Sequence, residues 1–189
     1  MTARTPAIDP ELARRVELVI FDADGVLTDA GVYVGRTEGG EHVELKRFDI
    51  QDGVGLKMLM WSGLEVAIVS GRVSEATAIR ARELGIGECH QEPDAHKLKV
   101  VETLLERLGV PWDRVAMLAD DIPDLSVLTR VGLKAAVGNA TSAVADVADW
   151  QATRIGGHGA AREFTDALLT ARGELEGVIE RYVAERSVT

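Results

Sequence analysis

Short apolar runs alternate with amphipathic segments along most of this chain. The runs are rich in Val, Ile, Leu and Ala and show no polar face, which is typical of strands buried on both sides of a sheet. Strands are therefore predicted at residues 16–21, 65–70, 114–119 and 133–137, with a shorter one near residues 87–91.

Helical spacing of apolar residues fills the intervals between those runs. Ser74 is a suitable N-cap for one helix, and Gly85 is a suitable stop. Residues 31–48 differ, because two short apolar stretches flank the pair Gly39 and Gly40 and so predict a β-hairpin. Helices are predicted at residues 52–63, 71–85 and 96–109, and a helix or a frayed tail at residues 174–189.

Repeated strand–helix units predict an α/β fold with a doubly wound, mainly parallel sheet of the Rossmann-like type. At 189 residues the chain is long enough to bury one sizeable core. We expect an N-terminal extension over residues 1–15, the main domain over residues 16–173 and a C-terminal helical tail over residues 174–189.

The charge balance narrows the classes of partner. The chain carries 31 acidic and 21 basic residues, a formal net charge of -10, which argues against a nucleic-acid binder or a binder of anionic membranes. A phosphorylated small substrate stays possible, because a bound metal can reverse the local field. The first residues lack the apolar segment of a secretory signal, and no long apolar run follows, so we expect a cytoplasmic protein.

Cysteine and histidine give no sign of chemistry of their own. Cys89 is the only cysteine, which fits a reducing compartment, and it is expected to be a small buried side chain rather than a nucleophile. The histidines show no metal-ligand spacing and are expected at the surface, with His158 near a substrate at most.

Polar residues stand where the predicted strands end. Asp22 and Asp24 follow the first strand, Ser70 ends the second, Lys97 opens the helix after the third, and Asp120 follows the fourth. Ligands of open α/β sheets bind outside the carboxyl ends of the strands, so these groups are expected to meet at one rim. A lone Asp-x-Asp usually caps a turn, but the joint placement of these groups indicates a site.

These motifs resemble those of the haloacid dehalogenase superfamily of aspartyl phosphatases. The corresponding stretches are FDADGVLTD, VSGR, Lys97 and ADDIPD. Within the superfamily, GGEHVELKRFDIQDGVGLKML, ADDIPDLSVLTRVGL and IGGHGAAREFTDALL resemble the 3-deoxy-D-manno-octulosonate 8-phosphate phosphatase family. The resemblance covers roughly residues 16–173, which would then form a haloacid dehalogenase-like phosphatase domain. It departs from the family pattern at Ala119, at Ser70 and in the loop before Lys97.

The resemblance implies a role for each catalytic candidate. Asp22 would attack phosphorus and form an aspartyl-phosphate. Asp24 would protonate the leaving oxygen and later take a proton from water. Ser70 would hydrogen-bond a phosphate oxygen, and Lys97 would support the charged form of Asp22.

The same resemblance implies a Mg²⁺ cofactor. Its protein ligands would be Asp22, the backbone carbonyl of Asp24, and Asp120, since Mg²⁺ prefers hard oxygen ligands. Asp121 would hydrogen-bond to the metal ligands without contacting the metal itself. Alternatively, Asp121 and Asp124 could serve as N-cap or helix-dipole partners of the helix that begins near Pro123, and the two roles can coexist.

The substrate candidates rest largely on the resemblance. Gly71 and Arg72 would contact the substrate, although Arg72 could equally be a surface residue. Gly157 and Arg162 would belong to a substrate-binding tail, against the alternative of a plain loop and helix start. The substrate would be a phosphorylated sugar acid, an octulosonate 8-phosphate or a related ulosonate phosphate.

The chain has no insertion long enough for a cap domain, so the site is expected to be open unless another subunit covers it. The hairpin at residues 31–48 could act as a small flap but is too short to seal a site. The resemblance implies a homotetramer in which a neighbouring subunit completes each site.

Other functions stay open at this stage. A nonulosonate 9-phosphate or another sugar phosphate could be the substrate. A non-catalytic phosphatase-like partner of a cytidylyltransferase is a further alternative. A signalling receiver domain shares the fold class, acidic residues, Mg²⁺, a hydroxyl and a lysine, but the Asp-x-Asp-Gly at residues 22–25 with ADDIPD favours the phosphatase.

Overall fold

The computed structural model describes residues 7–187 and shows the predicted parallel sheet. Its six strands run in the order β5-β4-β1-β6-β7-β8, and every neighbouring pair is parallel. The strands are β1 Leu18–Phe21, β4 Glu65–Ser70, β5 Glu88–Gln91, β6 Val115–Ala119, β7 Leu133–Ala136 and β8 Trp150–Gln151. The first five confirm the predicted strands, whereas β8 was not predicted.

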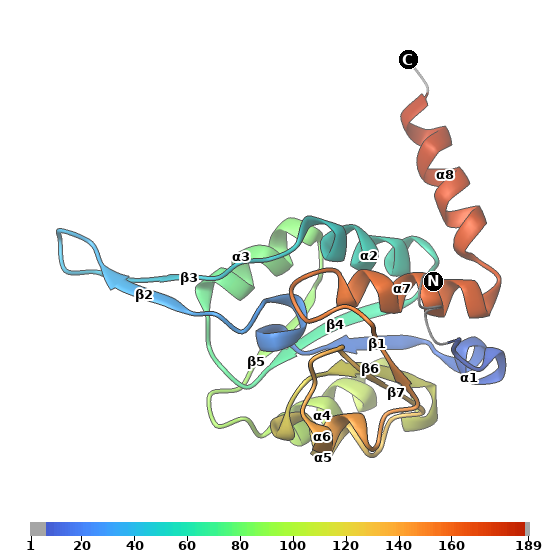
Figure 1. The fold of residues 1–189 in the computed structure, drawn as a ribbon, viewed down its shortest axis with the longest axis horizontal. Helices are drawn as coiled ribbons and strands as arrows, with labels where there is room; N and C mark the ends of the chain where they lie inside the picture. The colour runs from blue at the N-terminus through green and yellow to red at the C-terminus, as the bar shows by residue number, and fades with distance from the viewer. Residues whose placement is uncertain (1–6, 188–189) are drawn as a thin grey trace.

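Helices cover both faces of this sheet (Figure 1). On one face lie α2 and α7, with α3 beside them, and on the other lie α4, α5 and α6. The helices are α1 Pro10–Arg15, α2 Ile50–Trp61, α3 Glu75–Leu84, α4 Lys97–Leu108, α5 Leu125–Leu128, α6 Ser142–Ala145, α7 Ala160–Arg172 and α8 Leu175–Ser187. Short 3-10 turns are η2 Trp112–Arg114 and η3 Ile122–Asp124.

The central strand β1 shows why both faces must be covered. Val19 and Phe21 point into the core under α2 and α7, whereas Leu18 and Ile20 point into the core under α4 and α5. All these side chains are completely buried. Side chains alternate across a strand, so a strand that is apolar throughout needs a hydrophobic layer on each side.

Where a capping residue is present, the ends of the helix agree with the prediction. Ser74 accepts a hydrogen bond from the backbone N–H of Thr77 and begins α3, and Gly85 ends it with a left-handed backbone, φ 79°. By contrast, α2 begins two residues before the predicted start, because Asp49 accepts the hydrogen bond of Gln51 N–H.

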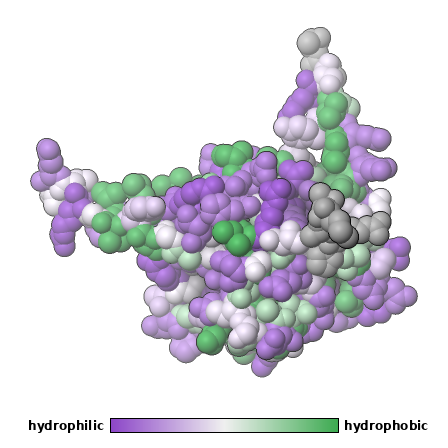
Figure 2. Space-filling model, viewed as in Figure 1, coloured by the Kyte–Doolittle hydropathy of each residue, from purple (hydrophilic) through white to green (hydrophobic). Residues whose placement is uncertain are grey.

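The predicted hairpin is confirmed and forms a separate two-stranded sheet, β2 Tyr33–Arg36 and β3 His42–Leu45. It projects from one end of the body, while α8 leaves the opposite end (Figure 1). Both projections carry apolar side chains at the surface, which Figure 2 shows in green. The exposed aliphatic ones are Val32, Val34 and Leu45 on the flap, and Ile179 and Val183 on α8. Tyr33 on the flap and Tyr182 on α8 are exposed as well.

Among residues 7–187, no helix is long and apolar enough to cross a membrane.

Candidate active site

The site begins where β1 ends. Asp22 is the first residue after the strand and is 5% exposed. The chain then makes a wide turn, η1 Ala23–Leu27, in which Thr28 N–H donates to the carbonyl of Ala23 over 3.0 Å. Gly25 has φ 94°, and a Cβ there would lie 2.0 Å from Asp120 Oδ2, so only glycine lets this turn approach Asp120.

Lys97 is the cation beside Asp22. It is the first residue of α4, it is 2% exposed, and its Nζ donates to Asp22 Oδ1 over 2.6 Å. The same Nζ donates to Asp124 Oδ1 over 2.6 Å. Burial alone would lower the pKa of Lys97, but these carboxylates hold that pKa above its usual value.

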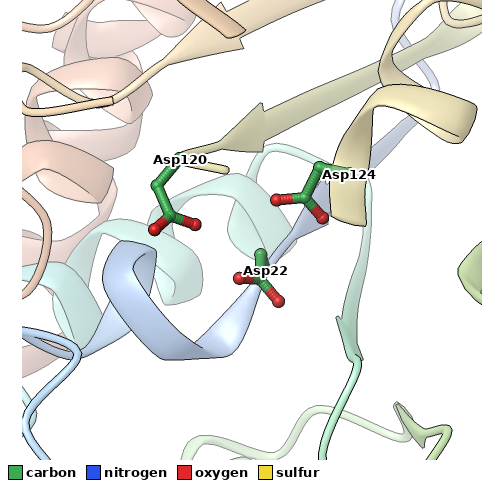
Figure 3. A group of neighbouring side chains, drawn as sticks. All are labelled: Asp22, Asp120 and Asp124. Atoms are coloured by element: carbon green, nitrogen blue, oxygen red, sulfur yellow. The ribbon is translucent and has the colours of Figure 1, made fainter. Parts of the chain in front are cut away.

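Three carboxylates converge on one point at this rim (Figure 3). Asp22, Asp120 and Asp124 each offer an oxygen, and those oxygens lie within 4.8 Å of one another. Burial and then repulsion by Asp22 and Asp124 raise the pKa of Asp120 to about 8. Burial and repulsion by Asp22 raise the pKa of Asp124 to about 7, against the attraction of Lys97. Burial also raises the pKa of Asp22, and Lys97 opposes that rise.

This cluster fits a hard divalent cation. One ammonium group cannot balance three carboxylates, so the cluster has an excess of negative charge that a proton or a cation must offset. Carboxylate oxygens are the ligands that Mg²⁺ prefers. Asp22, Asp120 and Asp124 could therefore hold a metal ion.

The stretch ADDIPD contributes Asp120 and Asp124 to this cluster, whereas Asp120 and Asp121 were expected from the sequence. Asp121 points outward and accepts a hydrogen bond from Ile122 N–H over 2.8 Å, which favours the capping alternative for this residue. Asp124, for which a cap or helix-dipole role was one alternative, is 1% exposed and makes no side-chain capping bond. The tight turn η3 directs Asp124 inward, where it contacts Lys97.

Asp24, the second carboxylate of the stretch FDADGVLTD, contacts a different group of side chains. Asp24 is partly buried, and both of its oxygens lie near Lys46 Nζ, at 2.8 and 3.0 Å. Arg72 Nη1 lies 3.2 Å from Asp24 Oδ2, and Thr28 Oγ1 lies 3.5 Å from Asp24 Oδ1. Asp22 and Asp24 therefore follow the same strand but have different surroundings.

The loop after β4 lies against the start of α4. Ser70 is 1% exposed, and its Oγ accepts a hydrogen bond from Arg72 N–H over 3.3 Å. At Gly71 a Cβ would lie 3.1 Å from Ala95 Cβ and 3.4 Å from Lys97 Cε, so the loop passes close to the lysine. Arg72 leaves this loop half exposed and pairs with Asp24 and Glu44.

Gly156 and Gly157, just before α7, pack on the turn that follows β1 in the same chain. A Cβ at Gly156 would lie 1.7 Å from the carbonyl oxygen of Gly25, and one at Gly157 would lie 2.3 Å from the backbone of Thr28. The N–H of Gly157 donates to the carbonyl of Val26 over 2.9 Å. Packing against this turn therefore requires glycine at both positions, a requirement that could not be seen in the sequence.

Arg162 is not brought to the aspartate cluster within the described chain. Its Nε donates to Asp166 Oδ1 over 2.8 Å, and its backbone N–H donates to the buried Asp52. It lines a pocket of about 850 Å³ on α7 together with Arg154 and Glu163. That pocket contains none of the residues of the aspartate cluster.

Sequence reasoning missed Lys46 and Glu44, and it left the role of Asp124 undecided. Glu44 lies in β3 and Lys46 follows it, where the alternation of polar and apolar residues in HVELK is typical of a strand with one side in solvent. Asp124 could have been suspected from its spacing of four residues after Asp120, because one turn brings such residues to the same side.

Comparison with known proteins places the chain among phosphatases of this type. The pattern of haloacid dehalogenase-like hydrolases matches residues 91–164. The 3-deoxy-D-manno-octulosonate 8-phosphate phosphatase of Escherichia coli is 39% identical over 164 residues, which span 87% of this chain and 85% of that protein.

Two solved structures share the fold over most of their length. One is a probable yrbi family phosphatase from Pseudomonas syringae, 42% identical with a TM-score of 0.84, covering 92% of this chain and 96% of that one. The other is a 3-deoxy-D-manno-octulosonate 8-phosphate phosphatase from Moraxella catarrhalis in complex with magnesium, phosphate and KDO. It is 33% identical with a TM-score of 0.84, covering 92% of this chain and 97% of that one.

The described chain thus has an Asp-x-Asp at the end of β1, a lysine bonded to the first of these carboxylates, and a cluster of aspartates. The fold that carries them is shared with a solved phosphatase over nearly the whole chain. The chain belongs to the haloacid dehalogenase-like hydrolases and, within them, to the family of 3-deoxy-D-manno-octulosonate 8-phosphate phosphatases.

Proposed function

We propose that this phosphatase hydrolyses the phosphomonoester of a sugar acid, 3-deoxy-D-manno-octulosonate 8-phosphate or a related ulosonate phosphate, through an aspartyl-phosphate and with Mg²⁺. The observation that carries the proposal is the placement of Asp22. Its carboxylate is buried at the rim of the sheet, bonded to Lys97 and within 4.8 Å of the Asp120 and Asp124 carboxylates. A nucleophile for phosphorus needs this combination of fixed position and charge compensation.

In the first step an oxygen of Asp22 attacks phosphorus, and the bond between phosphorus and the sugar oxygen breaks. Asp24 gives its proton to that leaving oxygen. In the second step Asp24 takes a proton from water, the water oxygen attacks phosphorus, and the bond to Asp22 breaks to release phosphate. The different surroundings of Asp22 and Asp24 suit this division of roles.

The other groups hold the phosphoryl oxygens and balance charge. Ser70 ends β4 beside the Gly71 loop and is assigned to a phosphate oxygen. Lys97 orients Asp22 through their hydrogen bond. Bound by Asp22, Asp120 and the carbonyl of Asp24, with Asp124 alongside, Mg²⁺ would offset the charge of the carboxylates and of the transferring phosphoryl group.

Support for a sugar-acid substrate comes from a relative. The Moraxella catarrhalis structure contains magnesium, phosphate and KDO, and it shares 33% of its sequence with this chain. In this chain the Arg72 guanidinium is half exposed beside Asp24, and it could bind a second anionic group of the substrate if that group took the place of its pairs with Asp24 and Glu44.

The experiment is a panel of phosphate-release assays with Mg²⁺. We expect the octulosonate 8-phosphate to give the highest kcat/KM, ahead of nonulosonate 9-phosphates, hexose phosphates and nucleotides. The Asp22→Asn variant, near-isosteric but unable to form the aspartyl-phosphate, should be inactive and folded. A protein inert with every ester would instead support a non-catalytic partner of a sugar-nucleotide enzyme, and preference for a 9-phosphate would change the substrate only.

We also propose a homotetramer whose sites are completed by a neighbouring subunit. Large apolar side chains are exposed on the flap, with Tyr33 at 66% and Val34 at 68%, and such surfaces are typical of interfaces. Sedimentation velocity tests this assembly, and a fully active monomer at the assay concentration would exclude it.

A further inference from the structure

A lysine with a buried side chain lies at the base of the flap, outside the aspartate cluster. The side chain of Lys46 follows β3 and is 0% exposed, although lysine is almost never fully buried unless it is paired. Placing an ammonium group there costs free energy that its partners must offset. The identity of those partners indicates what the lysine does.

Lys46 Nζ has one dominant partner. It lies 2.8 Å from Asp24 Oδ1 and 3.0 Å from Asp24 Oδ2, so it binds both oxygens of that carboxyl. Thr77 Oγ1 accepts a longer hydrogen bond of 3.3 Å, and Glu44 lies 3.7 Å away. Thr77 is completely buried on α3, so the ammonium group is fixed between the body of the protein and Asp24.

The contacts of Lys46 restrict the carboxyl more than those of Arg72. Arg72 reaches only Asp24 Oδ2, at 3.2 Å, and its side chain is 47% exposed. Lys46 bridges both oxygens from a buried position, so rotation of the carboxyl about its last bond would break one of the two contacts. A substrate could displace the exposed Arg72 without moving Lys46.

We infer that Lys46 is a positioning residue that fixes the Asp24 carboxyl for proton transfer to the leaving oxygen. The inference rests on the proposed function, in which Asp24 exchanges a proton with the leaving group and with water. Lys46 does not itself transfer a proton or contact the phosphoryl group. It acts through Asp24, and its loss should therefore matter only where Asp24 matters.

The basicity of the leaving group separates this role from others. Phenolate from phenyl phosphate is basic, with a phenolic pKa of about 10, so its departure needs a proton. The p-nitrophenolate group departs as an anion and needs little help, and the two esters differ only by the nitro group on the ring. For kcat/KM, which reports the steps up to formation of the aspartyl-phosphate, a positioning defect should harm phenyl phosphate selectively.

The experiment measures kcat/KM for both esters with Mg²⁺ in the wild type, Lys46→Met, Asp24→Asn and the double variant. Lys46→Gln is a second test variant that keeps a polar side chain and guards against misfolding. Arg36→Met is the matched control: it removes a cation from the same flap, whose guanidinium donates to the Gly40 carbonyl over 3.1 Å. Thermal unfolding of each variant verifies the fold.

We expect Lys46→Met to lower kcat/KM for phenyl phosphate by up to ~10²-fold, since a small misplacement of a catalytic group can cost that much. The loss for p-nitrophenyl phosphate should be at least tenfold smaller, and Arg36→Met should be neutral. In the Asp24→Asn background, Lys46→Met should add no leaving-group selectivity, because both changes remove the same proton transfer.

Equal losses on both esters, no loss on either, or a further loss in the Asp24→Asn background would overturn the positioning role. The last result would place Lys46 on the substrate itself. A wild type inert with both aryl esters and with every sugar phosphate of the panel above would remove the proposed function together with the inference. An active wild type with unselective Lys46 variants would remove the inference alone.

Discussion

The ammonium nitrogen of Lys97 lies 2.6 Å from a carboxylate oxygen of Asp124, and both side chains are almost completely buried. The same nitrogen lies 2.6 Å from Asp22, so one lysine joins the end of β1 to the turn after β6. Removing one partner of a buried, hydrogen-bonded pair leaves the other charge uncompensated, which makes Asp124 a sharp test of the site.

Asp124→Asn should therefore weaken metal activation. It removes one negative charge from the cluster of Asp22, Asp120 and Asp124 and leaves Asp22 as the charged partner to which Lys97 is bonded. Loss of a group that supports metal ligands typically costs ~10–100-fold in affinity or activity. The measurement is the Mg²⁺ concentration for half-maximal activity. Asp121→Asn, a change in the neighbouring exposed cap, is the control and should leave that concentration nearly unchanged.

Stability of the metal-free protein should fall as pH rises from about 4 to about 8. The pKa of Asp120 is raised to about 8 and that of Asp124 to about 7, so over this range the folded state binds more protons than the unfolded state. By linkage each such carboxyl lowers the free energy of unfolding by up to ~1.4 kcal/mol per pH unit between its unfolded and folded pKa values.

Mg²⁺ should oppose that fall, because bound metal takes the place of the protons. The measurement is Tm in EDTA and in Mg²⁺ across this pH range, and the gap between the two should widen with pH. A gap that stays constant would show that the carboxyls are not the metal site. Asp120→Asn should flatten the pH dependence in EDTA.

Gly156→Ala should destabilise the fold and disturb the site together. Its Cβ would lie 1.7 Å from the carbonyl oxygen of Gly25, in the turn that carries Asp24. Overpacking of this kind typically costs ~1–3 kcal/mol. Urea unfolding measures the loss. Gly177→Ala in α8 is the control, since a Cβ there meets nothing within 4 Å and alanine favours a helix. A Gly156→Ala protein as stable as wild type would contradict the close packing.

Arg162→Ala tests the shared site. Within the described chain its guanidinium pairs with Asp166 and is not brought to the aspartate cluster, so a direct contact with substrate at that cluster would come from another subunit. An arginine binds a carboxylate through parallel hydrogen bonds, and a sugar acid carries one. We expect a larger loss of kcat/KM for the octulosonate phosphate than for p-nitrophenyl phosphate. Equal losses would indicate a folding effect, and Arg154→Ala in the same pocket is the control.

Much of the site could be predicted from the sequence because strand ends have a fixed geometry. Parallel strands bring their carboxyl ends to one edge, so an aspartate after β1 and another after β6 must lie near each other. Lys97 follows the same rule at the start of α4. The caps Ser74 and Gly85 were predictable for a similar reason, since local hydrogen bonds and a left-handed glycine need no distant partner.

Long-range packing decided the rest. β8 has two residues and exists only because β7 offers it hydrogen bonds. The side chain of Lys46 is buried because the end of β3 lies against α3, and the alternating pattern of a hairpin strand cannot show that contact. Gly156 and Gly157 could be read as a loop for substrate, yet they pack on the first motif of the same chain.

The sequence by itself therefore determined the order of strands and helices, the apolar core and the residues at the strand ends, because these depend on local periodicity and on the direction of each strand. Only the tertiary structure decided that Asp124 rather than Asp121 turns inward, and that Lys46 holds Asp24. Those choices depend on the path of a turn and on burial between segments distant in the chain. A side chain's neighbours there are set by packing, which no short stretch of sequence contains.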